Sequence, residues 1–124
     1  MALKVRVTES RPFSRTVYLE GRLNNETVAV FDEELKKIVS SPASVVVFDL
    51  SGLEYISSAG LRSIFGIQKI MTARSGKAVL ANPQPAVRKV LEIVNAVDLT
   101  AVFKSVEELD RYLDTMQRKV AGGE

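Results

Sequence analysis

The sequence predicts an α/β protein with a mixed, largely parallel sheet of about five strands and four helices, in the order β-β-α-β-α-β-α-β-α. Short apolar segments of strand length alternate with longer segments whose apolar residues recur at helical spacing. The unbroken apolar run at residues 45–48 is typical of a strand in a parallel sheet, where both faces are covered. Together these two observations favour a parallel sheet flanked by helices.

The first half of the chain begins with two predicted strands, at residues 4–8 and 16–20. Their short connection predicts an antiparallel hairpin, and Gly21 is expected to end the second strand. A helix follows at residues 27–40, where the apolar residues fall on one face, and Ser41-Pro42 ends it. The strand at residues 45–48 comes next.

The second half repeats the strand–helix alternation. A helix is expected at residues 59–75, because serine is a preferred N-cap and Gly76 a preferred C-terminal stop. The remaining elements are a strand at residues 77–81, a helix with Asn82-Pro83 at its start, a strand at residues 100–103 and a helix capped by Ser105.

Length and composition limit the possible functions. The 124 residues carry a net charge of +2 and suit one domain, which we expect at residues 1–117 with a frayed tail at 118–124. Cys and His are both absent, which excludes a thiol nucleophile, a cysteine zinc site and the usual histidine-dependent catalytic triads. Carboxylates, Lys, Tyr, hydroxyls and backbone groups remain available for chemistry, and we predict no cofactor and no metal site. Near-neutral charge and 6% aromatic residues argue against nucleic-acid binding, and no apolar run is long enough to span a membrane.

The most informative segment is residues 45–65, where a strand is followed by a loop, a pair of serines and a helix. The loops at residues 21–26 and 51–57 and at Asn82-Pro83 are expected at one edge of the sheet, which brings Asn24 close to Ser58. Unpaired amide groups at a helix start favour an anion, so a phosphate on Ser58 would be stabilised. Small neighbours at Ala59 and Gly60 are expected to leave this hydroxyl open. Either serine can instead serve only as a cap.

Several short motifs carry a family resemblance. They are Asp49-Leu50, Ser-Ser-Ala-Gly-Leu at residues 57–61, Gly-Arg-Leu-Asn at residues 21–24, Asn82-Pro83, and Leu99-Thr100 with Phe103. In this order and spacing the chain resembles the STAS family of bacterial anti-sigma factor antagonists, over most of its length. The family's usual Asp residues are replaced by Asn24 and Ser57.

The resemblance implies a cytoplasmic, non-enzymatic switch in transcription regulation. The unphosphorylated protein would bind an anti-sigma factor and release a sigma factor. The anti-sigma factor, a serine kinase of ATPase fold, would phosphorylate Ser58, with Ser57 as the alternative acceptor, and a metal-dependent serine phosphatase would reverse the modification. The predicted partner-binding residues are Asn24, Ser57, Ser58, Ala59, Gly60, Arg62, Gly66 and Lys69.

Other interpretations remain open from the sequence. One is a STAS scaffold or nucleotide-binding module in another signalling or transport assembly, although no phosphate-binding glycine-rich loop is present. A receiver domain phosphorylated on Asp49 lacks the acidic pair that should follow its first strand. The acidic run at residues 32–34 suggests a metal site less than a solvated helix face, since Lys36 and Lys37 adjoin it. The basic side of the helix at residues 59–75 is either a docking surface or simply solvated.

Overall fold

The computed structural model describes residues 3–96, and within them the chain forms a four-stranded mixed sheet. β1 (Leu3–Arg11) and β2 (Ser14–Leu23) make the predicted antiparallel hairpin. β3 (Val45–Ile56) pairs in parallel with β2, and β4 (Lys77–Ala81) pairs in parallel with β3. The strand expected at residues 100–103 and the helix expected from Ser105 lie outside the described residues.

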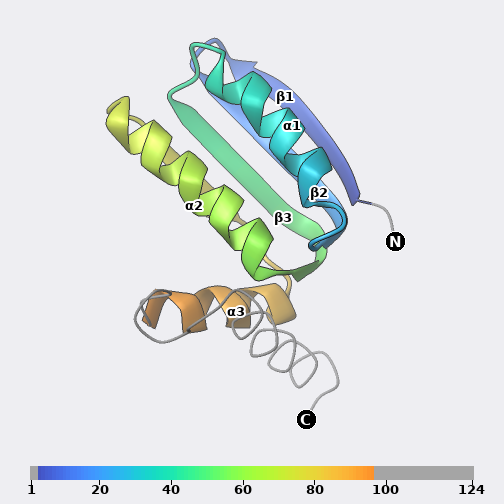
Figure 1. Ribbon diagram of the computed structural model, residues 1–124. Helices are drawn as coiled ribbons and strands as arrows, with labels where there is room; N and C mark the ends of the chain where they lie inside the picture. Colours follow the sequence, from blue (N-terminus) through green and yellow to red (C-terminus); the bar gives the residue numbers. More distant parts are fainter. Residues whose placement is uncertain (1–2, 97–124) are drawn as a thin grey trace.

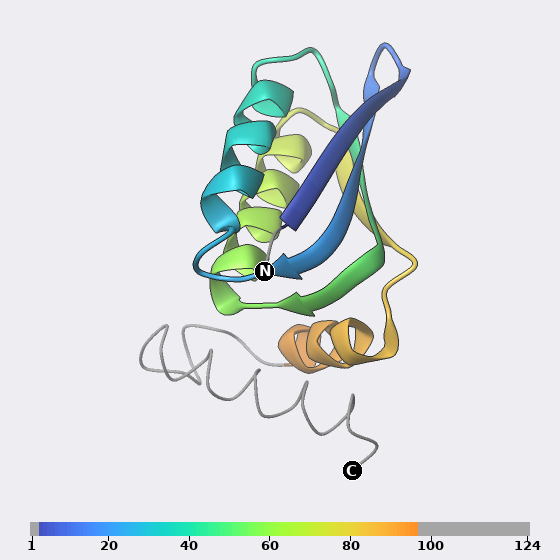
Figure 2. The ribbon, with the colours of Figure 1, turned by 90° about the vertical axis from the view of Figure 1, so that its right-hand side faces the viewer.

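Two helices cover one face of this sheet. α1 (Val28–Val39) and α2 (Ser58–Ala73) lie side by side along the strands, whereas α3 (Pro85–Ala96) crosses below the end at which β3 finishes and α2 begins (Figures 1 and 2). The order of the described elements therefore agrees with the predicted α/β alternation. Within residues 3–96 no helix has the length and apolar character needed to cross a membrane.

The burial of β3 corrects the expectation that both of its faces are covered. Val46, Phe48 and Leu50 are fully buried, but the alternate residues Val45 and Val47 are only partly buried. Burial alternates along β3 because α1 and α2 both pack on the same face of the sheet. The largest side chains of that face meet where the ring of Phe31 on α1 packs edge-on against Phe48, with centroids 5.9 Å apart.

The strands β2 and β3 are longer than predicted. Gly21 does not end β2; it lies inside the strand at a φ of 109°, where the register with β3 shifts before Arg22. Residues 51–57 were expected to form a loop, but β3 continues to Ile56. Gly52 permits this, because an added Cβ there would come within 3.0 Å of the Leu19 carbonyl oxygen on β2. These glycines therefore mark irregularities in the pairing of β2 with β3 and not the ends of the strands.

The third helix also begins later than predicted. Asn82 was expected to cap it with Pro83 in the first turn, but α3 starts at Pro85. Asn82 instead adopts a left-handed conformation with a φ of 55°, which Asn tolerates better than most residues. The side-chain amide of Gln84 then donates to the carbonyl oxygen of Ser51 at 2.8 Å, which ties the segment to β3.

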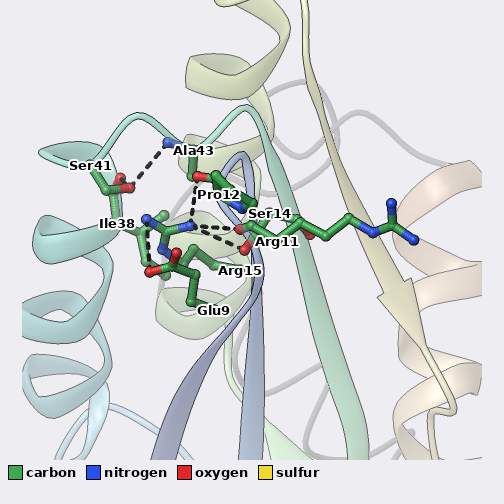
Figure 3. A network of polar contacts seen from close by, with 8 residues as sticks. All are labelled: Glu9, Arg11, Pro12, Ser14, Arg15, Ile38, Ser41 and Ala43. Atoms are coloured by element: carbon green, nitrogen blue, oxygen red, sulfur yellow. Dashed lines mark hydrogen bonds and ion pairs between the residues drawn. The ribbon is translucent and has the colours of Figure 1, made fainter.

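The opposite end of the sheet is braced by two arginines. The guanidinium of Arg15 donates to the carbonyl oxygens of Arg11, Pro12 and Ser14 around the hairpin turn and lies 3.8 Å from the Glu9 carboxylate (Figure 3). Arg74, just after α2, donates to the carbonyl oxygens of Val39, Ser41 and Ala43 beyond α1. Both arginines satisfy carbonyl groups that lie at turns or at a helix end.

Candidate functional site

The carboxyl ends of β2 and β3 lie side by side. The amide of Ser57 donates to the carbonyl oxygen of Leu23 at 2.9 Å, so the last residue of β2 is bonded directly to the residue that precedes α2. Asn24 and Ser58 are the next residues along each chain segment. The prediction that Asn24 and Ser58 lie close together is therefore confirmed.

Asn24 organises the loop that leads into α1. Its side-chain oxygen accepts hydrogen bonds from the amides of Glu26 and Thr27, at 2.9 and 3.0 Å. The Thr27 hydroxyl in turn donates to the carbonyl oxygen of Arg22 at 2.8 Å and accepts from the Asn24 amide at 2.9 Å. Sequence reasoning missed Thr27, although an Asn followed three residues later by Thr before a helix is a recognisable turn signal.

The role of the Asn24 side chain in this loop is that of an acceptor. Its bonds from the amides of Glu26 and Thr27 both use the side-chain carbonyl oxygen, and a carboxylate oxygen accepts in the same way. Asp at this position would therefore keep the loop and change only its charge. The local structure does not require a neutral side chain here.

Ser57 is the N-cap of α2. Its backbone is extended, its hydroxyl oxygen accepts from the amide of Gly60 at 3.3 Å, and its carbonyl oxygen accepts from the amide of Leu61 at 3.0 Å. This geometry decides which of the two serines caps the helix. Asp caps helices as well as Ser does, so the cap is also compatible with either charge.

Ser58 is buried, and the prediction of an open hydroxyl is wrong for this conformation. Its exposed fraction is 0%, and that of Ser57 is 2%. The cause lies in β3, because the strand continues to Ile56 and the bond from Ser57 to Leu23 draws the start of α2 against the end of the sheet. A phosphate cannot occupy this position unless the start of α2 moves.

Gly60 and Gly66 meet opposite surroundings on the same helix. A Cβ added to Gly60 would lie 2.6 Å from Cγ of Leu23 and 3.2 Å from Cγ1 of Ile56, both in the core. Gly60 is therefore a packing residue and not an open neighbour of Ser58, which corrects the sequence interpretation. A Cβ added to Gly66 would meet nothing within 4 Å. Ala59 is partly buried.

The outward face of α2 has the predicted character. Leu61, Ile64 and Met71 are fully buried, and Phe65 is partly buried against the core. Exposed residues on the other side are Arg62, Gly66, Lys69 and Ala73. Ser63 joins the two helices, since its hydroxyl donates to the Asp32 carboxylate at 2.6 Å.

Two other sequence candidates lie away from this end of the sheet or are otherwise occupied. Asn82 follows β4, which pairs only as far as Asp49, so it lies about 20 Å short of Ser57 along the strand direction. On α1 the side chains of Glu33 and Glu34 form ion pairs with Lys36 and Lys37, at 2.9 and 3.0 Å. No cluster of acidic residues that could hold a metal ion occurs within the described part of the chain.

Comparison with known proteins places these features in a family. The STAS domain matches residues 4–109. A putative anti-sigma factor antagonist of Bordetella bronchiseptica, BtrV, is 36% identical over 89 residues, which cover 72% of this chain and 77% of that protein.

The fold has counterparts among solved structures. SpoIIAA, an anti-sigma factor antagonist, in its unphosphorylated form aligns with a TM-score of 0.63 and 19% identity, over 73% of this chain and 83% of that one. An anti-sigma factor antagonist from Mycobacterium paratuberculosis aligns with the same score and identity, over 93% of this chain and 94% of that one. These likenesses establish the α/β fold.

Proposed function

The chain belongs to the STAS domain family, and we propose that it is an anti-sigma factor antagonist that binds an anti-sigma factor and thereby releases a sigma factor. The observation that carries this proposal is the junction of β2 and β3, where Asn24, Ser57 and Ser58 meet beside the exposed face of α2. The likeness to BtrV over 72% of the chain supports it. Because the sigma factor acts on RNA polymerase, we place the exchange in the cytoplasm.

The proposed docking surface consists of the start of α2 and its outward face. Arg62, Gly66 and Lys69 are exposed there, and the absence of a side chain at Gly66 leaves a gap between two long basic side chains. Glycine inside a helix costs about 0.5–1 kcal/mol relative to Ala. Since no neighbour in the described structure needs this gap, close approach of a partner explains it.

The proposed off-switch is phosphorylation, with Ser58 as the acceptor and Ser57 as the alternative. A phosphoryl group adds about −1.5 to −2 charges. A dianion at an interface costs binding through desolvation and repulsion, and a loss of about 3 kcal/mol weakens binding more than a hundredfold. The family resemblance implies that the anti-sigma factor is itself the serine kinase and that a metal-dependent phosphatase removes the group, so the chemistry belongs to the partners.

Burial of Ser58 adds a step to this switch. A kinase must reach the hydroxyl, and that requires the first turn of α2 to separate from the end of β2. Two of the ties to be broken are the bond from the Ser57 amide to Leu23 and the 3.3 Å capping bond from the Gly60 amide to the Ser57 hydroxyl. Local opening of this kind needs much less free energy than global unfolding.

The test is affinity capture from the native host followed by mass spectrometry. Wild type and Ser58→Ala are expected to retain a protein of ATPase fold, whereas Ser58→Asp loses it. Ser57→Asp is a comparison variant that adds the same charge one residue away at a position where Asp can cap the helix, so it separates the effect of charge from the effect of disturbing the buried Ser58. Since Ser58 is buried, circular dichroism must show that Ser58→Asp is folded.

A second measurement identifies the acceptor. Incubation of the captured partner with ATP and each variant is expected to phosphorylate wild type and Ser57→Ala but not Ser58→Ala. Equal capture by Ser58→Ala and a folded Ser58→Asp would contradict the switch. Phosphorylation of Ser58→Ala at Ser57 would move the switch to the alternative acceptor.

A further inference from the structure

The charged residues of the segment that contains α2 are all of one sign. Between Tyr55 and Leu91 the chain has no Asp or Glu, although it carries six basic residues. They are Arg62, Lys69, Arg74, Lys77, Arg88 and Lys89. This segment includes all of α2 and the first half of α3, which lie on either side of the junction that holds Ser58 (Figures 1 and 2).

Most of these cations are not neutralised by the protein itself. Arg62, Lys69, Arg88 and Lys89 are exposed and form no ion pair in residues 3–96. By contrast, Lys36 and Lys37 on α1 are each paired with a Glu three residues earlier. Arg74 is used internally, because its guanidinium donates to three carbonyl oxygens at the far end of α1.

Two neutral residues, Asn24 and Ser57, stand where the family usually has Asp, so negative charge is also missing there. Asn24 and Ser57 both act through an oxygen that accepts hydrogen bonds from backbone amides, and Asp would do the same at either position. The fold therefore gives no reason for the missing negative charge. A surface that must attract an acidic partner does give one.

We propose that the anti-sigma partner presents an acidic segment to Arg62, Lys69, Arg88 and Lys89, and that phosphorylation of Ser58 weakens binding by offsetting this positive charge. The inference rests on the proposed function and adds the chemistry of the partner to it. Four unpaired cations on the two helices beside the junction steer an acidic partner during encounter and raise the association rate. A dianion placed among them removes about half of that charge.

The experiment measures the association rate of the purified partner from the capture experiment by stopped-flow fluorescence. Ionic strength is raised from about 0.01 M to about 0.1 M, which shortens the screening length from about 30 to about 10 Å. For wild type the association rate is expected to fall about tenfold or more. Arg62→Gln/Lys69→Gln and Arg88→Gln/Lys89→Gln are each expected to bind more slowly and to depend less on salt.

The matched control is Lys36→Gln/Lys37→Gln, which removes the same charge from an exposed face of α1. It is expected to retain the wild-type rate and salt dependence. Asn24→Asp adds one negative charge while keeping the acceptor oxygen, and it is expected to slow association.

The outcomes distinguish failure of the acidic-partner inference from failure of the proposed function. A partner that binds wild type at a salt-independent rate, or binds both α2 and α1 double variants equally, overturns the acidic-partner inference and leaves the proposed function intact. Failure of wild type to bind any ATPase-fold partner overturns both.

Discussion

Two alanine substitutions in the same helix should have opposite effects on stability. Gly60→Ala places a methyl group 2.6 Å from Cγ of Leu23, which is fully buried in the core. Gly66→Ala places the same group where nothing lies within 4 Å. Both substitutions gain helix propensity, although Gly60 lies in the first turn and gains less, so the difference between them reports mainly the packing at the start of α2.

The expected magnitudes follow from general values. Overpacking a well-filled core costs about 1–3 kcal/mol, and replacing Gly by Ala inside a helix gains about 0.5–1 kcal/mol. Gly66→Ala should therefore raise the free energy of unfolding by up to about 1 kcal/mol. Gly60→Ala should lower it by up to about 2 kcal/mol, since part of the clash is offset by propensity.

Urea unfolding followed by circular dichroism measures the free energy of unfolding of both variants. If its slope against urea concentration is the same as for wild type, the folded and unfolded states are comparable among the three proteins. If Gly66→Ala destabilised the protein, the conclusion that the space beside Gly66 is empty would be refuted. If Gly60→Ala were neutral, the close packing against Leu23 would be refuted. Partner affinity gives an independent reading, because Gly66→Ala should bind the anti-sigma factor about tenfold or more weakly despite its higher stability.

Three further predictions concern other contacts. Arg74→Lys should lower the free energy of unfolding by about 1–3 kcal/mol in urea titrations, because one ammonium cannot reach three separate carbonyl oxygens. Ser57→Ala removes the α2 cap and should cost about 1 kcal/mol by the same assay, while phosphorylation persists. The pKa of Asp49 is held below its usual value by hydrogen bonds from the amide and then the hydroxyl of Ser51. The ionised carboxylate therefore stabilises the fold above about pH 4, and this contribution is lost as the pH falls through the lower pKa of the folded protein. In acid unfolding, the free energy of unfolding of Asp49→Asn should consequently fall less steeply with pH than that of wild type.

The elements that sequence reasoning predicted correctly are those with local signals. α2 begins after Ser57, a preferred N-cap, and its apolar face repeats at helical spacing, so its core side and its exposed side were both identified, although it ends at Ala73 and not at residue 75. The hairpin of β1 and β2 was found for the same reason, since its turn and its alternation are adjacent in sequence.

The errors occurred where distant segments decide the structure. Gly21 and Gly52 are strand-breaking residues by local preference, yet pairing between β2 and β3 carries both strands past them through irregularities of register. The predicted end of β3 was consequently too early. Burial of Ser58 depends on where β3 ends and on the bond from Ser57 to Leu23, so the same error produced the wrong prediction of an open hydroxyl.

The hydrogen bonds at the two ends of the sheet bear on how Ser58, the proposed acceptor, can act as a switch although it is buried. At the end away from the site, Arg15 holds carbonyl oxygens of the hairpin turn between β1 and β2 (Figure 3). Arg74 holds carbonyl oxygens at the end of α1 and just after it, which ties α1 to the end of α2. At the site, the bonds from Ser57 to Leu23 and from Gly60 to Ser57 hold the first turn of α2. In the proposed switch, a phosphorylated Ser58 leaves its buried position when that turn unwinds, and the rest of the domain stays folded. The modification would then alter shape and charge together at the edge of the docking surface, which is where an anti-sigma factor would sense it.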